Sequence, residues 1–267
     1  MSHVFVVCAY RDSKYIGELF EALSSQTRRS KVIVTTSTPV ETMMEKADSF
    51  GFPVIVNPMA RGIAADWNFA YDQADADYVT LAHQDDIYLP EYAERVLGAL
   101  EQRETRGRLP ILAYTRYFEI RHGERVDSNT LLRVKNLMNA PIRLFPGSGW
   151  IRNRMLSMGC PISCPAVTYN KKRFPDFRFD ETMKNDMDWE GEARLASEKG
   201  DYIYLNTPLV GHRVHADSAT TININDGDRY REDYMMYKKY WPDPIARFLL
   251  SFYSRALKSN YTGDKNE

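Results

Sequence analysis

The sequence predicts an α/β fold in which a mostly parallel sheet is flanked by helices and a helical arm follows at the C-terminus. Over residues 1–105, short apolar runs alternate with segments of helical periodicity, and the connections between them are short. The runs are apolar throughout, which is typical of parallel strands buried on both faces. A chain of 267 residues can hold one large domain of this class or two small ones.

The first half of the chain begins with a predicted strand at residues 4–9. Ile16, Leu19, Phe20 and Leu23 then recur at helical spacing and predict an amphipathic helix. The same alternation continues with strands at 31–36, 54–56 and 78–82 and helices at 40–50, after the 59–65 loop, and after Pro90, which suits a first helical turn.

In the second half of the chain, the predicted strands and helices no longer alternate regularly. Residues 111–120 and 125–126 predict two strands joined by a turn at His122-Gly123, and residues 161–169 predict an edge strand or a loop. Residues 131–138 and 189–199 predict helices, 145–158 are ambiguous, and 202–205 predict a strand followed by a link at 206–208. Residues 223–233 are rich in Asp and Asn and predict a mobile loop.

Charge and composition exclude several classes of protein. The net charge of −1 gives no reason to expect a nucleic-acid partner. No apolar run approaches the ~20 residues that cross a bilayer, and Met1-Ser2-His3 leads directly into a strand with no signal peptide. The 3 cysteines cannot all pair and lack the spacing of a zinc site, so we expect a cytoplasmic protein.

Two adjacent carboxylates, Asp85 and Asp86, follow the predicted strand at 78–82. A parallel strand would deliver them to the carboxyl edge of the sheet, where open α/β sheets bind ligands. Their mutual repulsion would be relieved by a divalent cation, and oxygen ligands suit Mg²⁺ or Mn²⁺ carrying the diphosphate of a nucleotide. The alternative is a solvated loop that starts the next helix.

With these parts in order, the chain resembles the family 2 glycosyltransferases, which have the GT-A fold and use nucleotide sugars. The resemblance covers about residues 4–222 and rests on five segments: Ala9-Tyr10-Arg11 after the first strand, residues 57–68, His83-Gln84-Asp85-Asp86, residues 185–196, and His212-Arg213-Val214-His215 with the residues up to Ser218. It implies a catalytic domain over 1–222, with a nucleotide-sugar half at 1–105 and an acceptor half at 106–222.

For the donor, the resemblance implies that Asp85 and Asp86 hold the metal on the diphosphate, with Asp86 the more direct ligand. His83 stands where relatives often have another aspartate, and either contacts the nucleotide or is structural. The resemblance further implies donor contacts from Ala9, Tyr10, Arg11 and Gln84.

Two further segments bear on the donor nucleotide. The second strand ends in Thr35-Thr36-Ser37-Thr38, where many relatives have an acidic pair that binds the base. Hydroxyls such as that of Ser37 can still bond a uracil or thymine edge, so UDP or dTDP sugars are expected. Arg61 and Asp66 flank the start of the third helix, whose N-terminal amides suit a phosphate or ribose; a charged first turn is the alternative.

For the acceptor, the resemblance implies that the segment at 185–189 supplies the catalytic base. The carboxylate before the aromatic Trp189 is Asp188, and Asp186 is the alternative base. Asp and Glu also cap many helices, so a purely structural acidic first turn is the competing interpretation. Similarly, Arg213 could neutralise the leaving diphosphate and His215 could join the metal, or both could be structural.

The C-terminal segment 223–267 is predicted to be a mobile loop, an amphipathic helix starting near Pro244, and a disordered tail from Lys258. The helix has an apolar stripe and a basic stripe: Ile245, Phe248, Leu249, Phe252 and Ala256 on one side, Arg247, Ser251, Ser254 and Lys258 on the other. Such a helix can lie on a membrane surface, or pack on the catalytic domain or on a second copy in a homodimer.

The resemblance implies an inverting glycosyltransferase, soluble or peripheral on the inner membrane face, that moves a sugar to a glycan or lipid-linked acceptor in surface polysaccharide synthesis. A non-catalytic nucleotide- or glycan-binding member of the same fold is the first alternative, because the base-binding acidic pair is missing. A sugar nucleotidyltransferase is the second, although no glycine-rich loop follows the first strand.

Overall fold

The computed structural model describes residues 1–59, 62–215 and 227–262, with the side chains of the last helix described as far as Arg255. Within these residues, a sheet of nine strands has the order β3-β2-β1-β4-β8-β6-β9-β5, and β7 pairs with β6. The strands are β1 His3–Ala9, β2 Lys31–Thr36, β3 Val54–Val56, β4 Tyr78–His83, β5 Ile87–Tyr88, β6 Pro110–Arg121, β7 Glu124–Val126, β8 Val167–Asn170 and β9 Asp201–Val214.

The pairing confirms the predicted α/β fold. Strands β1 to β4 are parallel to their neighbours within this group, and β6 is parallel to β9. The antiparallel pairs involve β8, β5 and β7. The predicted hairpin is β6–β7, and its turn residues His122 and Gly123 have φ of 50° and 83°, the left-handed values of a tight hairpin turn.

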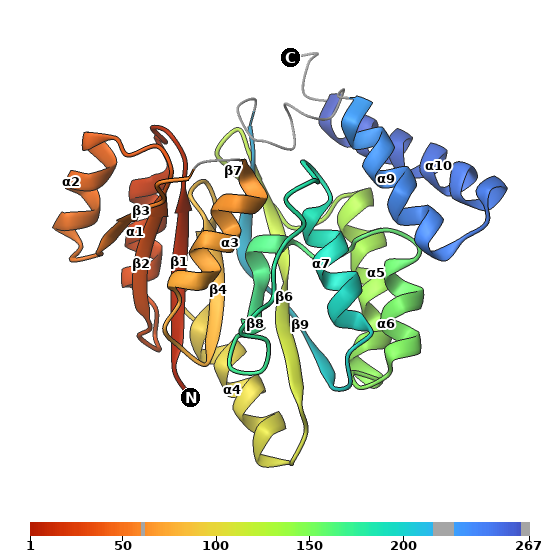
Figure 1. Ribbon diagram of the computed structural model, residues 1–267, viewed down its shortest axis with the longest axis horizontal. Helices are drawn as coiled ribbons and strands as arrows, with labels where there is room; N and C mark the ends of the chain where they lie inside the picture. The colour runs from red at the N-terminus through yellow and green to blue at the C-terminus, as the bar shows by residue number, and fades with distance from the viewer. Residues whose placement is uncertain (60–61, 216–226, 263–267) are drawn as a thin grey trace.

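Helices cover both faces of the sheet (Figure 1). They are α1 Ile16–Ser24, α2 Glu41–Ser49, α3 Ile63–Gln73, α4 Tyr92–Thr105, α5 Thr130–Leu144, α6 Gly149–Leu156, α7 Met187–Ala196, α9 Gly227–Tyr240 and α10 Asp243–Thr262, and a short 3-10 turn, η1, spans Cys164–Ala166.

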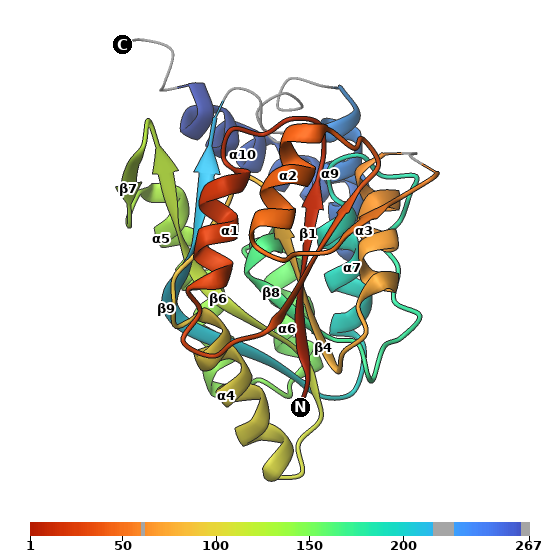
Figure 2. The ribbon, with the colours of Figure 1, turned by 90° about the vertical axis from the view of Figure 1, so that its left-hand side faces the viewer.

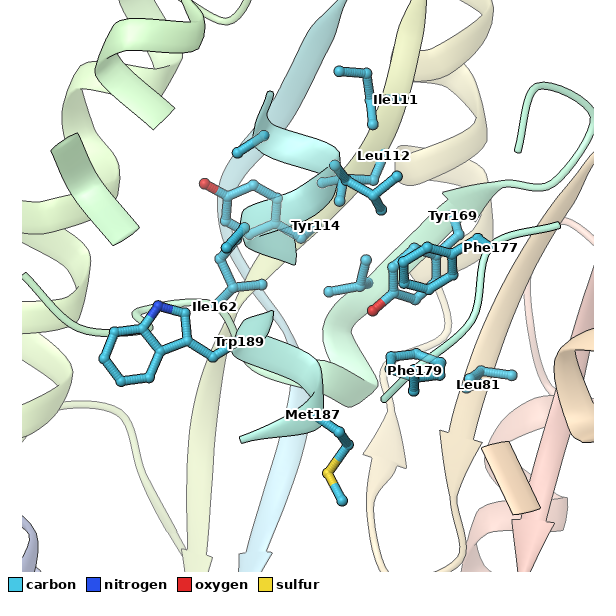
Figure 3. Close-up of a cluster of buried hydrophobic side chains, with 14 of the residues drawn as sticks. Leu81, Ile111, Leu112, Tyr114, Ile162, Tyr169, Phe177, Phe179, Met187 and Trp189 are labelled. Carbon is cyan, nitrogen blue, oxygen red and sulfur yellow. The ribbon is translucent and has the colours of Figure 1, made fainter. Parts of the chain in front are cut away.

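Two hydrophobic clusters lie on opposite faces, because alternate residues of β1 point to opposite sides. Phe5 and Val7 pack with α1, α2 and α4, and Figure 2 shows α1 and α2 side by side. Val4 and Val6 belong to the cluster covered by α3, α5, α6 and α7, whose aromatic and aliphatic centre is drawn in Figure 3.

The C-terminal helices belong to the same body as the sheet. Met236 and Tyr237 of α9 and Ala246 and Leu250 of α10 are fully buried or nearly so in the second cluster, where Trp189 packs edge-on against Tyr237. The predicted mobile loop at 223–233 is therefore wrong from Gly227 onward, where α9 begins; residues 223–226 lie outside the described residues. The predicted tail is also wrong in part, since α10 continues to Thr262.

Three smaller predictions also need correction. The link predicted at 206–208 lies inside β9, which stays paired with β6 through register shifts beside Pro208. Such irregularities let a strand accept a proline, which cannot donate to the ladder. The strand predicted at 161–169 is limited to β8 and is preceded by η1, and its predicted edge position is wrong because β8 lies between β4 and β6. The stretch at 145–158, which was ambiguous, contains α6. None of the described helices has the length and hydropathy that crossing a bilayer requires.

Candidate active site

A cavity of about 1220 Å³ lies where β1, β2 and β4 end. These strands are parallel, so the loops after all of them meet at one edge of the sheet. The cavity wall combines these loops with the start of α3, the segment before α7, and side chains of α5, α9 and α10. Segments separated by more than a hundred residues in the chain therefore share one space.

The acidic pair follows β4, and its members differ in position. Asp85 lies on the cavity wall, whereas Asp86 is only 1 % exposed and is not part of that wall. Asp86 Oδ1 accepts hydrogen bonds from the backbone N–H of Arg213 at 2.9 Å and from His212 Nδ1 at 3.1 Å. These contacts arise because β5 pairs with β9, which brings His212 and Arg213 beside the acidic turn.

The end of β9 also holds Asp85. His215 Nε2 lies 2.9 Å from Asp85 Oδ2, and Arg213 Nε donates to the Asp85 carbonyl oxygen at 2.9 Å. The rest of the Arg213 guanidinium pairs with Glu18 and lies over the Tyr15 ring, so Arg213 is behind the cavity wall. Burial acts to raise the pKa of Asp85. The hydrogen bond from His215 and the charges of the neighbouring histidines together outweigh burial, so the pKa of Asp85 lies below its usual value.

His83 is on the cavity wall and stacks on Trp67, with ring centroids 4.8 Å apart. Its Nδ1 lies 3.9 Å from Asp86 Oδ2. Burial lowers the pKa of His83, and the nearby Asp86 and Asp85 only partly oppose this shift, so the neutral ring is favoured. Among the described residues, His83 Nε2 and Asp86 Oδ2 are buried without a hydrogen-bond partner. Such groups are rare in folded proteins unless a bound group completes them.

The residues at the acidic turn fit a divalent cation held jointly with a ligand. Among the described residues, no group of three or more His, Cys, Asp or Glu side chains could hold a metal by itself. Mg²⁺ at nucleotide sites is instead held by one or two carboxylates together with phosphate oxygens. Asp85 on the wall and the unpartnered oxygen of Asp86 behind it match that requirement.

A further carboxylate lies at the end of β2. Asp66, in the first turn of α3, accepts a hydrogen bond from Ser37 Oγ at 2.8 Å and another from Asn57 Nδ2 at 2.8 Å. Ser37 and Asp66 both line the cavity. The chain has no acidic pair at the end of β2, but α3 brings the carboxylate of Asp66 to the same place. Arg61, predicted to contact the donor, lies outside the described residues.

The segment after β1 forms the neighbouring part of the wall, with Ala9, Tyr10 and Arg11. The side-chain amide of Gln84 holds the backbone of Tyr10 through two hydrogen bonds. Its Oε1 accepts from the Tyr10 N–H and its Nε2 donates to the Tyr10 carbonyl, both at 2.9 Å. Arg11 has φ of 56°, a left-handed conformation that is uncommon for a side chain other than glycine, and its N–H donates to Thr38 Oγ1. Strained backbone conformations of this kind are frequent at binding sites, where contacts with the surrounding structure stabilise them.

Asp188 and Asp186, at the start of α7, also line the cavity. Asp188 Oδ1 accepts the backbone N–H of Trp189 at 2.8 Å. Burial raises the pKa of Asp188 above its ordinary value, although that hydrogen bond and the charges of Arg229 and Lys135 act to lower it. Asp188 is therefore a half-buried carboxyl with increased proton affinity on the wall of a cavity.

Asp186 is in a different environment. It is 4 % exposed, and burial together with the carboxyl group of Asp233 on α9 raises its pKa well above the ordinary value. The segment just before α7 is held by another α9 residue, Glu232, which is 2 % exposed. Glu232 accepts the backbone N–H groups of Lys184, Asn185 and Asp186 at 2.9, 2.8 and 3.1 Å.

Sequence reasoning did not identify several residues on or behind this wall. Trp67 was not among the predicted site residues, and Arg229 and Glu232 lie in the segment predicted to be a loop. The spacing of Glu232, Met236 and Tyr237, all buried, is the helical signal that could have revealed α9.

Comparisons with known proteins agree with this arrangement. The sequence profile described as Glycosyl transferase family 2 matches residues 4–143. A Haemophilus influenzae protein named "Uncharacterized glycosyltransferase" is 28% identical over 99 residues, which cover 36% of this chain and 34% of that protein. This chain thus matches about a third of the length of that relative.

Solved structures with the same fold include glycosyltransferases. S. aureus TarS 1-349 superposes with a TM-score of 0.64 at 14% identity, covering 94% of this chain and 69% of that one. TarS 1-349 in complex with UDP-GlcNAc has a TM-score of 0.64 at 16% identity, covering 94% and 70%. The mannosyltransferase PcManGT from Pyrobaculum calidifontis, in complex with GDP-Man and Mn²⁺, has a TM-score of 0.62 at 11% identity, covering 95% and 68%. These likenesses establish the GT-A fold.

Proposed function

This chain belongs to glycosyl transferase family 2, and from that premise we propose that it is an inverting glycosyltransferase that moves a sugar from a UDP or dTDP sugar to a hydroxyl of a glycan or lipid-linked acceptor. The observation that carries the proposal is the single cavity whose wall holds Asp66, Asp85 and Asp188. Each carboxylate suits a different part of the reaction: the base of the nucleotide, its diphosphate, and the attacking hydroxyl.

The base of the donor is assigned to the end of β2. A carboxylate accepts a hydrogen bond from a ring N–H, which uracil, thymine and guanine possess and which cytosine and adenine lack at their pairing edge. Asp66 is held by Ser37 and Asn57 with lone pairs to spare, so it can accept one more such bond. TarS has been solved with UDP and with UDP-GlcNAc, and PcManGT with GDP-Man, which is consistent with a base of this kind.

The diphosphate is assigned to the acidic turn. Asp85, with Asp86 and His215 beside it, would hold Mg²⁺ or Mn²⁺. When bound, the cation offsets the negative charge that develops on the departing diphosphate. Asp85 is the direct ligand in this proposal, since Asp86 lies behind the wall, and Arg213 keeps the acidic turn in place through the Asp85 carbonyl.

The proton of the acceptor hydroxyl is assigned to Asp188. A general base works best when its pKa approaches the working pH, and burial shifts Asp188 in that direction. Inversion requires attack from the side opposite the leaving group, so the base must be separate from the carboxylates that face the diphosphate. Asp188 meets this requirement because it comes from α7 rather than from the turn after β4.

The experiment that tests the proposal is sugar transfer and donor hydrolysis over a panel of nucleotide sugars, with and without Mn²⁺. Turnover of a UDP or dTDP sugar that disappears in the Asp85→Asn/Asp86→Asn variant supports it. Metal-independent donor binding without hydrolysis or transfer would favour the non-catalytic alternative. Surface polysaccharide synthesis on the cytoplasmic side is the corresponding cellular role.

A further inference from the structure

A set of large apolar side chains is exposed on α5, on α6 and on α10. The most exposed of them are Leu137 and Leu144 at 76 %, Trp150 at 70 %, and Phe248 and Phe252 at 69 %. We call this surface the α5–α10 face; its apolar members are Val134, Leu137, Leu144, Phe145, Trp150, Ile245, Phe248 and Phe252.

The three helices that carry these side chains are neighbours. On α5, residues 134, 137, 141 and 144 recur at helical spacing and share one side, and Phe145 follows directly after the helix. Helix α5 packs against both α6 and α10, and all three lie on the right-hand side in Figure 1. The Arg154 guanidinium joins α6 to the start of α10, with its carbon 5.7 Å from the Trp150 ring centre and 4.9 Å from that of Trp241.

The face is also strongly basic, although the chain as a whole has a net charge of −1. No aspartate or glutamate occurs between Asp127 and Asp176, so α5 and α6 contain none. Within α10 the only acidic residue is Asp243, which is paired with Arg247 at 2.7 Å. Exposed cations occur on the same three helices: Arg133, Arg143, Arg154, Arg247 and Arg255.

We propose that the α5–α10 face docks on the surface of a membrane that contains anionic lipids. Apolar and aromatic side chains next to arginines are the composition that inserts between headgroups, while each guanidinium gains from the negative surface potential. A second copy of this chain fits poorly, because a two-fold symmetric contact would place the arginines of one copy against those of the other with almost no carboxylates between them. Sequence reasoning considered the last helix alone, whereas α5 and α6 supply much of this face.

The face adjoins the cavity, since α5 and α10 contribute to both. Leu131 and Lys135 of α5 and Tyr253 of α10 line the cavity wall. If the proposed function holds, an acceptor carried on a lipid of the bound membrane would be presented beside the side of the cavity that contains Asp188. This last step rests on the proposed function, whereas the docking itself does not.

The test is co-sedimentation of the full chain with vesicles of phosphatidylcholine, with or without phosphatidylglycerol, at increasing salt. Wild type should bind the anionic vesicles and release as salt rises. The variant Arg133→Gln/Arg143→Gln/Arg255→Gln should bind on the order of a hundredfold more weakly, given the gain expected per surface cation. The matched control Arg29→Gln/Arg95→Gln/Arg106→Gln removes exposed arginines around α1 and α4 and should bind like wild type.

A second variant, Leu137→Ser/Leu144→Ser/Phe248→Ser, tests the apolar component and should weaken binding while keeping its salt dependence. The proposal is overturned if wild type fails to sediment, if it binds neutral and anionic vesicles equally, or if the control loses as much binding as the arginine variant. A dimer in light scattering that the serine variant dissociates, with no vesicle binding, would assign the face to a second copy. Sedimentation needs neither donor nor acceptor, so an inactive protein that still binds vesicles refutes the proposed function and leaves this inference standing.

Discussion

Replacing Glu232 by glutamine should loosen the segment that carries Asp186 and Asp188 while leaving the donor end of the cavity unchanged. Glu232 reaches this segment from α9, and its two oxygens accept three backbone N–H groups that precede or cap α7. Glutamine keeps the size and shape of the side chain. However, its NH₂ group must take the place of one oxygen, and a donor then faces a donor.

The expected loss follows from these contacts. Oε1 accepts one N–H and Oε2 accepts two, so the amide oxygen will keep the pair and the NH₂ will face the N–H of Lys184. Losing one buried hydrogen bond to a charged acceptor costs about 1.5–3 kcal/mol, and the remaining bonds weaken without the charge. For a chain of this size that corresponds to a fall in Tm of roughly 3–6 °C.

The assay combines thermal unfolding with steady-state kinetics and donor binding by calorimetry. Turnover should fall with Tm, because the general base loses its fixed position. The donor Kd should stay within about twofold, since the hydrogen bonds of Glu232 go to the segment before α7 and not to the turn after β4. The matched control is Glu45→Gln on α2, an exposed glutamate whose replacement should change the free energy of unfolding by no more than the roughly 0.5 kcal/mol typical of surface sites. Unchanged Tm and kcat in Glu232→Gln would show that α9 does not position the catalytic segment.

Three further predictions concern individual carboxylates. Asp188→Asn should reduce turnover by roughly 10²-fold or more with nearly unchanged donor binding, and Asp186→Asn should have the smaller effect; steady-state kinetics giving the reverse ranking would move the base to Asp186. Asp66→Asn should weaken UDP binding by about 10–100-fold and CDP binding much less, because a charged acceptor for a ring N–H is lost; calorimetry that finds the same ratio of affinities before and after would remove Asp66 from the base site. Burial raises the pKa of Glu192 well above its ordinary range, so the folded protein retains a proton that the unfolded chain releases. Its contribution to stability is complete below the ordinary pKa and is lost as pH rises through the folded pKa, so the Tm of Glu192→Gln relative to wild type should increase with pH; a constant difference across the pH series would contradict this assignment.

Much of the fold was accessible from the sequence because it depends on local patterns. The alternation of apolar runs and helical stripes in residues 1–105 predicted β1 to β4 with their helices, and His122-Gly123 predicted the β6–β7 turn. These elements obey rules of spacing and turn chemistry that operate within a few residues. The acidic turn after β4 was predicted for the same reason, whereas the acidic start of α7 was predicted from the resemblance to family 2 glycosyltransferases.

The errors occurred where long-range contacts decide the structure. The polar sequence of helix α9 predicted a loop, yet its Glu232 and Asp233 are buried. Glu232 accepts backbone N–H groups of the distant segment before α7, and Asp233 interacts with the carboxyl group of Asp186 in that segment. Strand β9 passes Pro208 because β6 continues to pair on both sides of it. Neither the Asp186 segment nor strand β6 lies within a few residues of the element that it stabilises, so a local sequence pattern does not reveal these contacts.

The sequence by itself determined the family, the order of strands and helices in the first half, and the carboxylates that mark the candidate site, since each is written in residues close together in the chain. Only the tertiary structure decided where those carboxylates lie relative to the cavity. It placed Asp85 on the cavity wall and Asp86 behind it, brought Asp66 to Ser37, and turned the apolar stripe of α10 outward beside that of α5. Periodicity shows that a helix has an apolar side, but which side is buried depends on the packing of the whole chain, and that is set by contacts between segments far apart in sequence.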